Sequence, residues 1–364
     1  MCRIVTIASF AALSALPLAA QSNPSSKVDS LMATFFLERG PGAAVAVILD
    51  GRVVHQKSYG LADVERSLPI ASATTFDIGS VSKQFTAMAI MMLAESGTLS
   101  YEDPLTKFFP NFATHGAKIT VRHLLNHTSG LPDYRSLFER NPAGIGAEPS
   151  SQEIIALLAR AGALRFVPGE RYEYSNSGYV VLAQIVEKAA GLSFPQFLKS
   201  TVFEPLGMGS TIVSDQIMAP AVMRAISYEP ANGTFRNADY SPLNRIYGGG
   251  NVNSSLDDMV KWAQVLYTER LVKHNALEEA FTPGTLNNGS STTYGFGWLI
   301  GTINGRRVLS HGGAWAGFRA YIMRIPSERF RLIVLSNVAT AVNPGAVGRE
   351  IAIMYLGDRI PKLH

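Results

Sequence analysis

The two ends of this chain carry β-strand patterns, whereas its long middle carries helical ones. Near the start, β-branched residues flank the pair Asp50-Gly51 in GAAVAVILDGRVVHQKSYGLAD, which is typical of a tight hairpin. Beyond Tyr294 the strand pattern returns in GFGWLIG, RRVLSHGG, FRAYIMRIP and RFRLIVLSN. Since strands need partners, the pattern predicts an α/β (α+β) fold in which an antiparallel sheet, flanked by helices, is built from both chain ends.

The middle of the chain, from about residue 104 to 283, predicts a mostly helical inserted lobe. Its helical segments include TVRHLLNHTSG, SSQEIIALLARAG, SGYVVLAQIVEKAAG and SLDDMVKWAQVLY. Helix starts are expected at Thr120, Ser151 and Ser255, and helix ends at Gly130, Gly162 and Gly191. Because 364 residues exceed one ordinary core, we expect two lobes: a sheet lobe over about 28–80 and 290–364, and a helical lobe over about 84–285.

Residues 1–20 have the pattern of a secretory signal peptide. Arg3 precedes the apolar run IVTIASFAALSALPLAA, which ends in small residues before polar QSNPSSK. The alternative is an uncleaved membrane tether, for which the run is short. We therefore expect a periplasmic or secreted hydrolase domain over residues 21–364. Its mature form would contain no thiol, because Cys2 is the only cysteine.

The charge pattern gives no support for nucleic-acid binding. A net charge of +4 is spread over the chain, and the longest basic run is the pair Arg306-Arg307. No other stretch approaches membrane-spanning length, so no membrane span is expected in the mature chain. The expected partner is a small-molecule or peptide substrate, and the sequence does not reveal the oligomeric state.

The segment from Ser80 to Glu95 predicts a buried central helix whose first turn carries Ser80 and Lys83. A spacing of three places both side chains on one helix face, with Cβ atoms roughly 5 to 6 Å apart. A desolvated lysine is neutral enough to take the proton of a serine and make it a nucleophile. The alternative is a capping serine beside a solvated lysine.

Two further tripeptides carry candidate chemistry. In Tyr174-Ser175-Asn176, a tyrosine near two cations is expected to have a lowered pKa and to relay protons, and the asparagine amide to orient a substrate carbonyl. His311-Gly312-Gly313 ends a predicted edge strand, where an N–H group could bind an oxyanion. The alternatives are a helix cap for the first and a turn for the second.

In this order and at these distances, the three elements resemble the serine β-lactamase and penicillin-binding protein superfamily. The similarity is greatest to the branch with class C β-lactamases, DD-peptidases, D-aminopeptidases and family VIII esterases. It runs through most of the mature chain, in FDIGSVSKQFTA, LLNHTSGLPDY, PGERYEYSNSGYVVLAQIVEKAAG, GGGNVNSSLDDMVKWAQ, YGFGW and SHGGAWAGFRAY. The resemblance implies a β-lactamase/transpeptidase-like fold and a serine hydrolase without a cofactor.

The resemblance also implies roles for single residues. Ser80 would be the acylated nucleophile and Lys83 its activating partner, while Tyr174 would pass protons to the leaving group and activate the deacylating water. Asn176 would hold the substrate amide or ester. His311, Gly312 and Gly313 would replace the family's Lys-Thr-Gly triplet, and the N–H groups of Ser80 and Ala314 would form the oxyanion hole. How Lys83 and Tyr174 divide the role of base stays open.

The triplet departs from the family pattern, and this affects the expected substrate. His311 can be neutral and Gly312 has no hydroxyl, so the cation and the hydroxyl with which the family's triplet binds a substrate carboxylate are missing. We therefore expect an esterase or a peptidase-like enzyme that cleaves an ester or amide with an uncharged flank. The alternatives are a DD-carboxypeptidase, a class C-like β-lactamase, and a non-catalytic sensor of cell-wall peptides or penicillin.

Other hydrolase types are disfavoured by missing motifs. HLLNH places His123 and His127 four apart, but it lacks the glutamate of H-E-x-x-H and has only His115 as a nearby third ligand, so no metal site is expected. These histidines are expected to pack near a helix end. G-x-S-x-G is absent, which excludes an α/β-hydrolase elbow, and no E-x-x-L-N segment supplies a deacylating glutamate.

Overall fold

The computed structural model describes residues 23–36, 39–112, 117–140, 148–160, 163–214, 223–303, 305–339 and 343–357. The predicted signal peptide, His115 and the expected helix end at Gly162 lie outside these ranges. In the part of the chain that is described, no helix combines the length and the apolar character that crossing a membrane requires.

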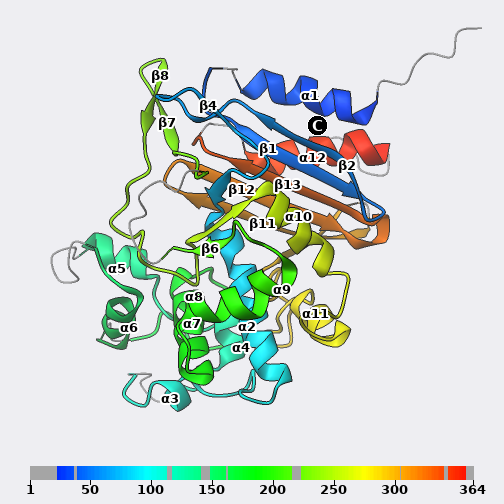
Figure 1. Cartoon of the computed structure of the whole chain (residues 1–364). Coiled ribbons are helices and arrows are strands. Elements are labelled where there is room, and N and C mark those ends of the chain that lie inside the picture. Colours follow the sequence, from blue (N-terminus) through cyan, green and yellow to red (C-terminus); the bar gives the residue numbers. More distant parts are fainter. Residues whose placement is uncertain are drawn as a thin grey trace, which may run out of the picture.

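A six-stranded antiparallel sheet forms the centre of the molecule (Figure 1). In spatial order its strands are β10 (Leu299–Ile303), β11 (Arg306–Trp315), β12 (Phe318–Ile325), β13 (Phe330–Ser336), β1 (Ala43–Leu49) and β2 (Arg52–Tyr59). The two chain ends meet where β1 pairs with β13, from Ala43 opposite Ser336 to Leu49 opposite Phe330. The prediction of one sheet built from both chain ends is therefore confirmed.

The hairpin between β1 and β2 has the expected turn. Asp50 and Gly51 both have positive φ, 51° and 81°, a conformation that Asp and Gly tolerate better than most residues.

The two faces of strand β1 contribute to two different hydrophobic cores. Val45 and Val47 pack with helices α1 (Pro24–Phe35) and α12 (Pro344–Leu356), whereas Ala44 and Ala46 join the core of the helical lobe.

The helical lobe surrounds α2 (Lys83–Glu95), which is buried on nearly every side. Phe85 of α2 packs against Trp262 and Phe203, at ring-centroid distances of 4.2 and 5.5 Å. The other helices of this part are α3 (Leu105–Phe108), α4 (Val121–Leu125), α5 (Tyr134–Arg140), α6 (Ser151–Arg160), α7 (Asn176–Ala190), α8 (Phe194–Leu198), α9 (Glu204–Leu206), α10 (Leu256–Val265) and α11 (His274–Ala280). The buried central helix is confirmed, but it begins at Lys83, because Gly79–Ser82 forms a 3-10 turn.

Three of the six expected helix boundaries are confirmed. Thr120 forms a capping box with His123, Ser255 Oγ accepts the N–H of Asp258, and Gly191 ends α7 at φ 70°. The N-cap of α6 is Ser150 and not Ser151 as expected, since Ser150 Oγ accepts the N–H of Glu153. The expected end at Gly130 is wrong, because α4 already ends at Leu125.

Three smaller sheets of short strands, which the sequence did not predict, lie outside the main sheet. β5 (Thr75–Asp77), β9 (Val252–Ser255) and β6 (Ile212–Val213) form a three-stranded sheet. Two hairpin-like pairs join β3 (Leu61–Asp63) to β4 (Leu68–Pro69) and β7 (Tyr228–Ala231) to β8 (Thr234–Asn237). They have only two to four residues each, too few for an alternating pattern to be recognised.

The assignment of His311 to an edge strand needs correction. β11 lies inside the sheet, between β10 and β12. However, β10 pairs with β11 only as far as Ser310, opposite Leu299, so residues 311–315 pair with β12 alone. The second half of β11 is therefore a local edge inside a longer sheet.

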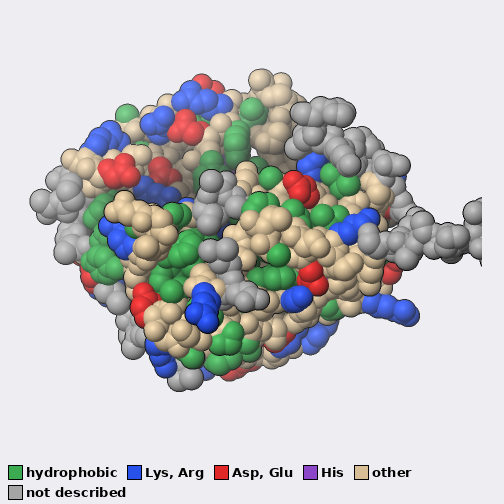
Figure 2. Space-filling view, turned by 90° about the horizontal axis from the view of Figure 1, so that it is seen from above, with side chains coloured by type: hydrophobic (Ala, Val, Ile, Leu, Met, Phe, Trp, Pro, Cys, Tyr) green, Lys and Arg blue, Asp and Glu red, His purple; other side chains and the backbone are tan. Residues whose placement is uncertain are grey.

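On the face shown in Figure 2, basic and acidic side chains are interspersed.

Candidate active site

Ser80 lies on the 3-10 turn between β5 and α2, and this turn is pressed against β11. Asp77 accepts the N–H of Gly79 at 2.7 Å, and Gly79 has φ 51°. A Cβ atom at Gly79 would lie 2.6 Å from the backbone nitrogen of Ala314, so only glycine fits there. The sequence Asp77-Ile78-Gly79 therefore holds the Ser80 backbone beside Ala314, the two residues expected to supply the oxyanion hole.

Lys83 is fully buried directly beneath Ser80. Its Nζ lies 3.2 Å from Ser80 Oγ, 2.9 Å from Asn176 Oδ1 and 2.8 Å from the carbonyl oxygen of Gly249. Burial lowers the pKa of Lys83 to about 7, and the positive charge of Arg135 adds to this effect. A neutral amine would donate its two N–H groups to Asn176 and Gly249, which leaves its lone pair for the Ser80 hydroxyl.

Tyr174 lies on the other side of Ser80. The residue is 36% exposed and lines the cleft. Its hydroxyl is in hydrogen-bonding contact with Ser80. Burial raises the pKa of Tyr174 above its ordinary value, although the hydrogen bond with Ser80 opposes the shift. The expected lowering of this pKa is therefore wrong, because desolvation exceeds the effect of the nearby cations. Tyr174 is a neutral phenol, able to donate a proton.

Asn176 begins α7 and is held by a carboxylate that the sequence reading missed. Asp133 Oδ2 accepts both the backbone N–H and the side-chain Nδ2 of Asn176, at 2.7 and 3.0 Å. The amide oxygen of Asn176 therefore faces Lys83, and its second Nδ2 hydrogen is left for a substrate. Asp133 lies in the matching segment LLNHTSGLPDY, which was the available signal for it.

His311 is buried on β11, and both of its ring nitrogens have partners in the protein. Nδ1 lies 2.7 Å from the carbonyl oxygen of Gly312, and Nε2 lies 2.8 Å from the hydroxyl of Tyr294. Since a carbonyl only accepts, Nδ1 carries the proton and Nε2 accepts from Tyr294. Burial lowers the pKa of His311 to about 3, so the ring is neutral.

A cavity of ≈ 480 Å³ brings the predicted site residues together. It is lined by seven of them: Ser80, Tyr174, Asn176, His311, Gly312, Gly313 and Ala314. Lys83, the eighth, lies below its floor, within reach of Ser80. The lining also includes Arg135 and Arg319, which were not predicted as site residues, although Arg319 lies in the matching segment SHGGAWAGFRAY. Arg135 is held against Trp315, with its guanidinium 5.0 Å from the ring centroid.

The two histidines of HLLNH have separate structural roles. His123 accepts the N–H of Thr120 in the capping box of α4. His127 is buried, accepts the N–H of Ser175, and packs its ring on Tyr174 at 4.2 Å and on Tyr294 at 4.5 Å. The expected packing of both histidines at the end of a helix that stops at Gly130 is correct only for His127, because α4 ends at Leu125 and His123 lies in its first turn. Within the described ranges, no group of three or more His, Cys, Asp or Glu side chains could hold a metal ion.

Comparisons with known proteins agree with this geometry. The Beta-lactamase family model matches residues 28–353. Penicillin-binding protein 4* of Bacillus subtilis (strain 168) is 36% identical over 300 residues, which cover 79% of this chain and 66% of that protein. A D-aminopeptidase of Cereibacter sphaeroides (strain KD131) is 30% identical over 329 residues, 90% of this chain and 62% of that one.

Solved structures show the same relationship. The octameric penicillin-binding protein homologue from Pyrococcus abyssi superposes with a TM-score of 0.80 at 29% identity, over 92% of this chain and 79% of that chain. This chain spans less than two thirds of the length of the two curated relatives above. With the family model matching most of its length and the serine, lysine and tyrosine side chains converging on one cleft, this chain belongs to the β-lactamase family of serine hydrolases.

Proposed function

We propose that this chain hydrolyses esters or amides through an acyl-enzyme on Ser80, with Lys83 and Tyr174 as its proton-handling partners. The observation that carries the proposal is the contact of 3.2 Å between Ser80 Oγ and a fully buried lysine amine. Burial lowers the pKa of Lys83 to about 7, so a large fraction of the amine is neutral near neutral pH. A neutral amine at this distance is a competent general base.

Acylation begins when Ser80 Oγ attacks the substrate carbonyl carbon and its proton passes to Lys83. The carbonyl oxygen becomes an oxyanion, which the N–H groups of Ser80 and Ala314 would bind. As the intermediate collapses, Tyr174 gives its proton to the leaving group and regains one from the ammonium of Lys83. The product is an ester of Ser80, and the lysine is again neutral.

Deacylation repeats these transfers with water in place of the leaving group. Water attacks the Ser80 ester, its proton goes to the Lys83 and Tyr174 pair, and Ser80 Oγ leaves with a proton from that pair. Tyr174 acts as a neutral phenol in both half-reactions, since burial raises its pKa. Asn176, fixed by Asp133 and Lys83, would orient the substrate carbonyl with its remaining N–H.

The proposed substrate is a small ester or amide. His311 offers no cation, because it is neutral and both its nitrogens are bonded within the protein. The names of the relatives, a penicillin-binding protein and a D-aminopeptidase, support a DD-carboxypeptidase or class C-like β-lactamase as the second candidate. A non-catalytic sensor is disfavoured, since serine, lysine and tyrosine are all present. The sequence of residues 1–20 supports export to the periplasm or beyond.

The test is the hydrolysis of p-nitrophenyl butyrate by Ser80→Ala. We expect kcat/KM to fall by about 10⁴-fold or more, with little change in the midpoint of thermal unfolding. Ser96→Ala, at the exposed end of the same helix, is the matched control and should keep full activity. Turnover retained by Ser80→Ala would remove the covalent mechanism.

A panel of four substrates ranks the candidates: p-nitrophenyl butyrate, nitrocefin, a D-aminoacyl amide and a D-Ala-D-Ala peptide. We expect the ester to have a higher kcat/KM than nitrocefin, because the neutral His311 and Gly312 do not bind a carboxylate. The two arginines of the cavity are engaged within the protein: Arg135 packs on Trp315, and Arg319 donates to the carbonyl oxygens of Ala316 and Phe318. The reverse order would establish the β-lactamase candidate in place of the esterase.

A further inference from the structure

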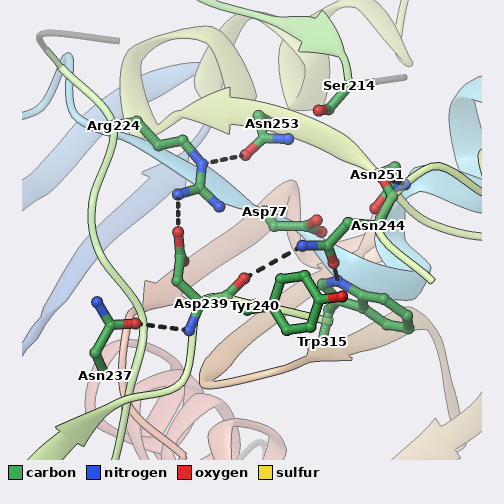
Figure 3. A pocket seen from close by; sticks show the side chains of 10 residues that line it. All are labelled: Asp77, Ser214, Arg224, Asn237, Asp239, Tyr240, Asn244, Asn251, Asn253 and Trp315. Atoms are coloured by element: carbon green, nitrogen blue, oxygen red, sulfur yellow. Dashed lines mark hydrogen bonds and ion pairs between the residues drawn. The ribbon is translucent and has the colours of Figure 1, made fainter. Parts of the chain in front are cut away.

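A second polar cavity lies behind the turn that carries Ser80. It has a volume of ≈ 250 Å³, and we call it the Asp77 pocket (Figure 3). Its lining residues are Asp77, Ser214, Arg224, Asn237, Asp239, Tyr240, Asn244, Asn251, Asn253 and Trp315. Asn251 and Trp315 also line a small recess beside Ser80, so the Asp77 pocket adjoins the proposed active site.

The Asp77 pocket contains charged groups of both signs, one guanidinium and two carboxyl groups. Arg224 forms an ion pair of 2.5 Å with Asp239 and donates from Nε to Asn253 Oδ1 at 3.3 Å. Asp77, the third charged group, is buried at the end of β5. A bound cation would lie near Arg224, and a bound anion near two carboxylates. Both cases are unfavourable in a buried site, so the electrostatics favour a neutral ligand.

Several polar side-chain atoms of the pocket residues have no hydrogen-bond partner among the described residues. Asp77 uses one oxygen for the N–H of Gly79, which leaves the other one open, and Asn251 uses Nδ2 for the carbonyl of Asn244, which leaves Oδ1. In the same way Arg224 keeps Nη2 and Asn253 keeps Nδ2. None of these atoms is among the fully enclosed, unpartnered atoms of the described chain, and their residues line the cavity, so they are available to a ligand there.

The open groups are donors and acceptors in about equal number. A hydroxyl is the group that satisfies both, because it donates one hydrogen bond and accepts others. Trp315 is fixed in the wall by a hydrogen bond of 2.6 Å from its Nε1 to Asn244, and it adds an aromatic surface. Polar groups that converge around such a surface are the usual composition of a small-molecule site.

We propose that the Asp77 pocket is a second ligand site, which binds a neutral, hydroxyl-rich ring such as a monosaccharide or a cyclitol. Hydroxyl groups of the ring donate to Asp77 and Asn251 and accept from Arg224 and Asn253. The carbon face of the ring packs on Trp315.

Occupancy of this site would reach Ser80 through Asp77. The carboxylate that faces the pocket also holds the N–H of Gly79, the residue before Ser80. A hydroxyl that donates to the free oxygen of Asp77 favours the ionised form and so strengthens the bond to Gly79. This link, unlike binding itself, rests on the proposed hydrolase function. It predicts that the ligand raises kcat/KM for p-nitrophenyl butyrate about twofold near pH 6.

Binding is tested by tryptophan fluorescence of the full chain with D-glucose or myo-inositol. We expect a saturable change with a dissociation constant of about 1 to 10 mM, as suits a few hydrogen bonds in a preformed site. Ser80→Ala should bind equally well, so failure of the hydrolase proposal leaves this test intact. Trp315→Phe should lose the signal, since the other two tryptophans, Trp262 and Trp298, are buried elsewhere in the core.

Two pocket variants give the decisive result. Asn253→Ala removes a proposed donor, and Asn237→Ala removes an exposed lining residue whose Oδ1 accepts the N–H of Asp239. Each should weaken binding by about tenfold, and the exposed site protects the test against misfolding of the first variant. Asn288→Ala, in an exposed loop outside the pocket, is the matched control. The proposal is overturned by no saturable change up to about 100 mM sugar, by equal binding in both pocket variants, or by a response to glycine betaine and not to the sugars.

Discussion

The turn Gly79–Ser82 separates two polar regions that are buried in the same molecule and use their hydrogen-bonding groups differently. On the cleft side, Lys83 has a protein partner for each position of its amine: Ser80, Asn176 and Gly249. On the other side, the Asp77 pocket leaves donors and acceptors facing a cavity. Full internal pairing fixes one reactive geometry, whereas open pairing leaves room for a ligand.

The largest expected effect comes from removing the amine of the fully paired region. Lys83→Met should lower kcat/KM for p-nitrophenyl butyrate by about 10⁴-fold, because Ser80 loses its base. Its thermal midpoint should stay equal or rise. The pKa of Lys83 is lowered on folding, so burial of this amine costs stability at neutral pH.

The matched control for this variant is Lys199→Met, since Lys199 is exposed. It should keep its activity. If Lys83→Met kept more than about a tenth of the wild-type kcat/KM, Lys83 would not be the base.

A smaller effect is expected from the carboxylate that supports the cleft. Asp133→Ala should lower kcat by about 10²-fold, since Asn176 loses both hydrogen bonds that fix its amide. Asp133→Asn keeps an oxygen acceptor and should recover part of the loss. Equal kcat in wild type and Asp133→Ala would show that Asn176 is positioned without this carboxylate.

The pH dependence should follow the amine of Lys83. The base must be neutral, so kcat/KM should fall below an apparent pKa of about 7, by about tenfold for each pH unit. His311 and His127 do not titrate in this range, because burial lowers the pKa of His311 to about 3 and that of His127 well below its ordinary value. If Asp77→Asn abolished the fall of kcat/KM at low pH, that fall would be due to the carboxyl group of Asp77 and not to the amine of Lys83.

The difference between the two regions also explains what the sequence could predict. Ser80, Lys83, Tyr174 and Asn176 belong to motifs, and the structure places them around one cleft, as the resemblance implied. The main sheet was predictable too, because its strands are long enough to show a pattern. Asp133 was within a matching segment, but its role depends on a contact between the loop before α5 and the first residue of α7, which spacing does not encode.

The Asp77 pocket could not be predicted for the same reason. Its residues are spread between residues 77 and 315. Asp77, Asn251, Asn253 and Trp315 lie within matching segments, but no spacing along the chain indicates that they enclose a cavity. The direction of the pKa shift of Tyr174 was also out of reach, since it depends on how deeply the hydroxyl is buried. A motif identifies residues that lie at a fixed spacing along the chain. Cavities and the desolvation of side chains, in contrast, result from how distant segments pack together.

The smallest expected effect concerns Asp77, which joins the two regions. Burial raises the pKa of Asp77 to about 6 in the folded protein, above its ordinary value of 3.8. Its ionised form is therefore destabilising, and this cost is fully present above about pH 6 and vanishes as the pH falls toward 4. Asp77→Asn keeps an oxygen for the N–H of Gly79, so it should raise the free energy of unfolding by about 1 to 3 kcal/mol at pH 8 and change it little at pH 4.

Asp50→Asn is the control, because Asp50 lies in an exposed hairpin turn where asparagine tolerates the same positive φ. It should show no such pH-dependent gain in the free energy of unfolding. A loss of stability in Asp77→Asn at pH 8 would mean that attraction to Arg224 outweighs desolvation, and the Asp77 pocket would then be a closed ion network like the cleft.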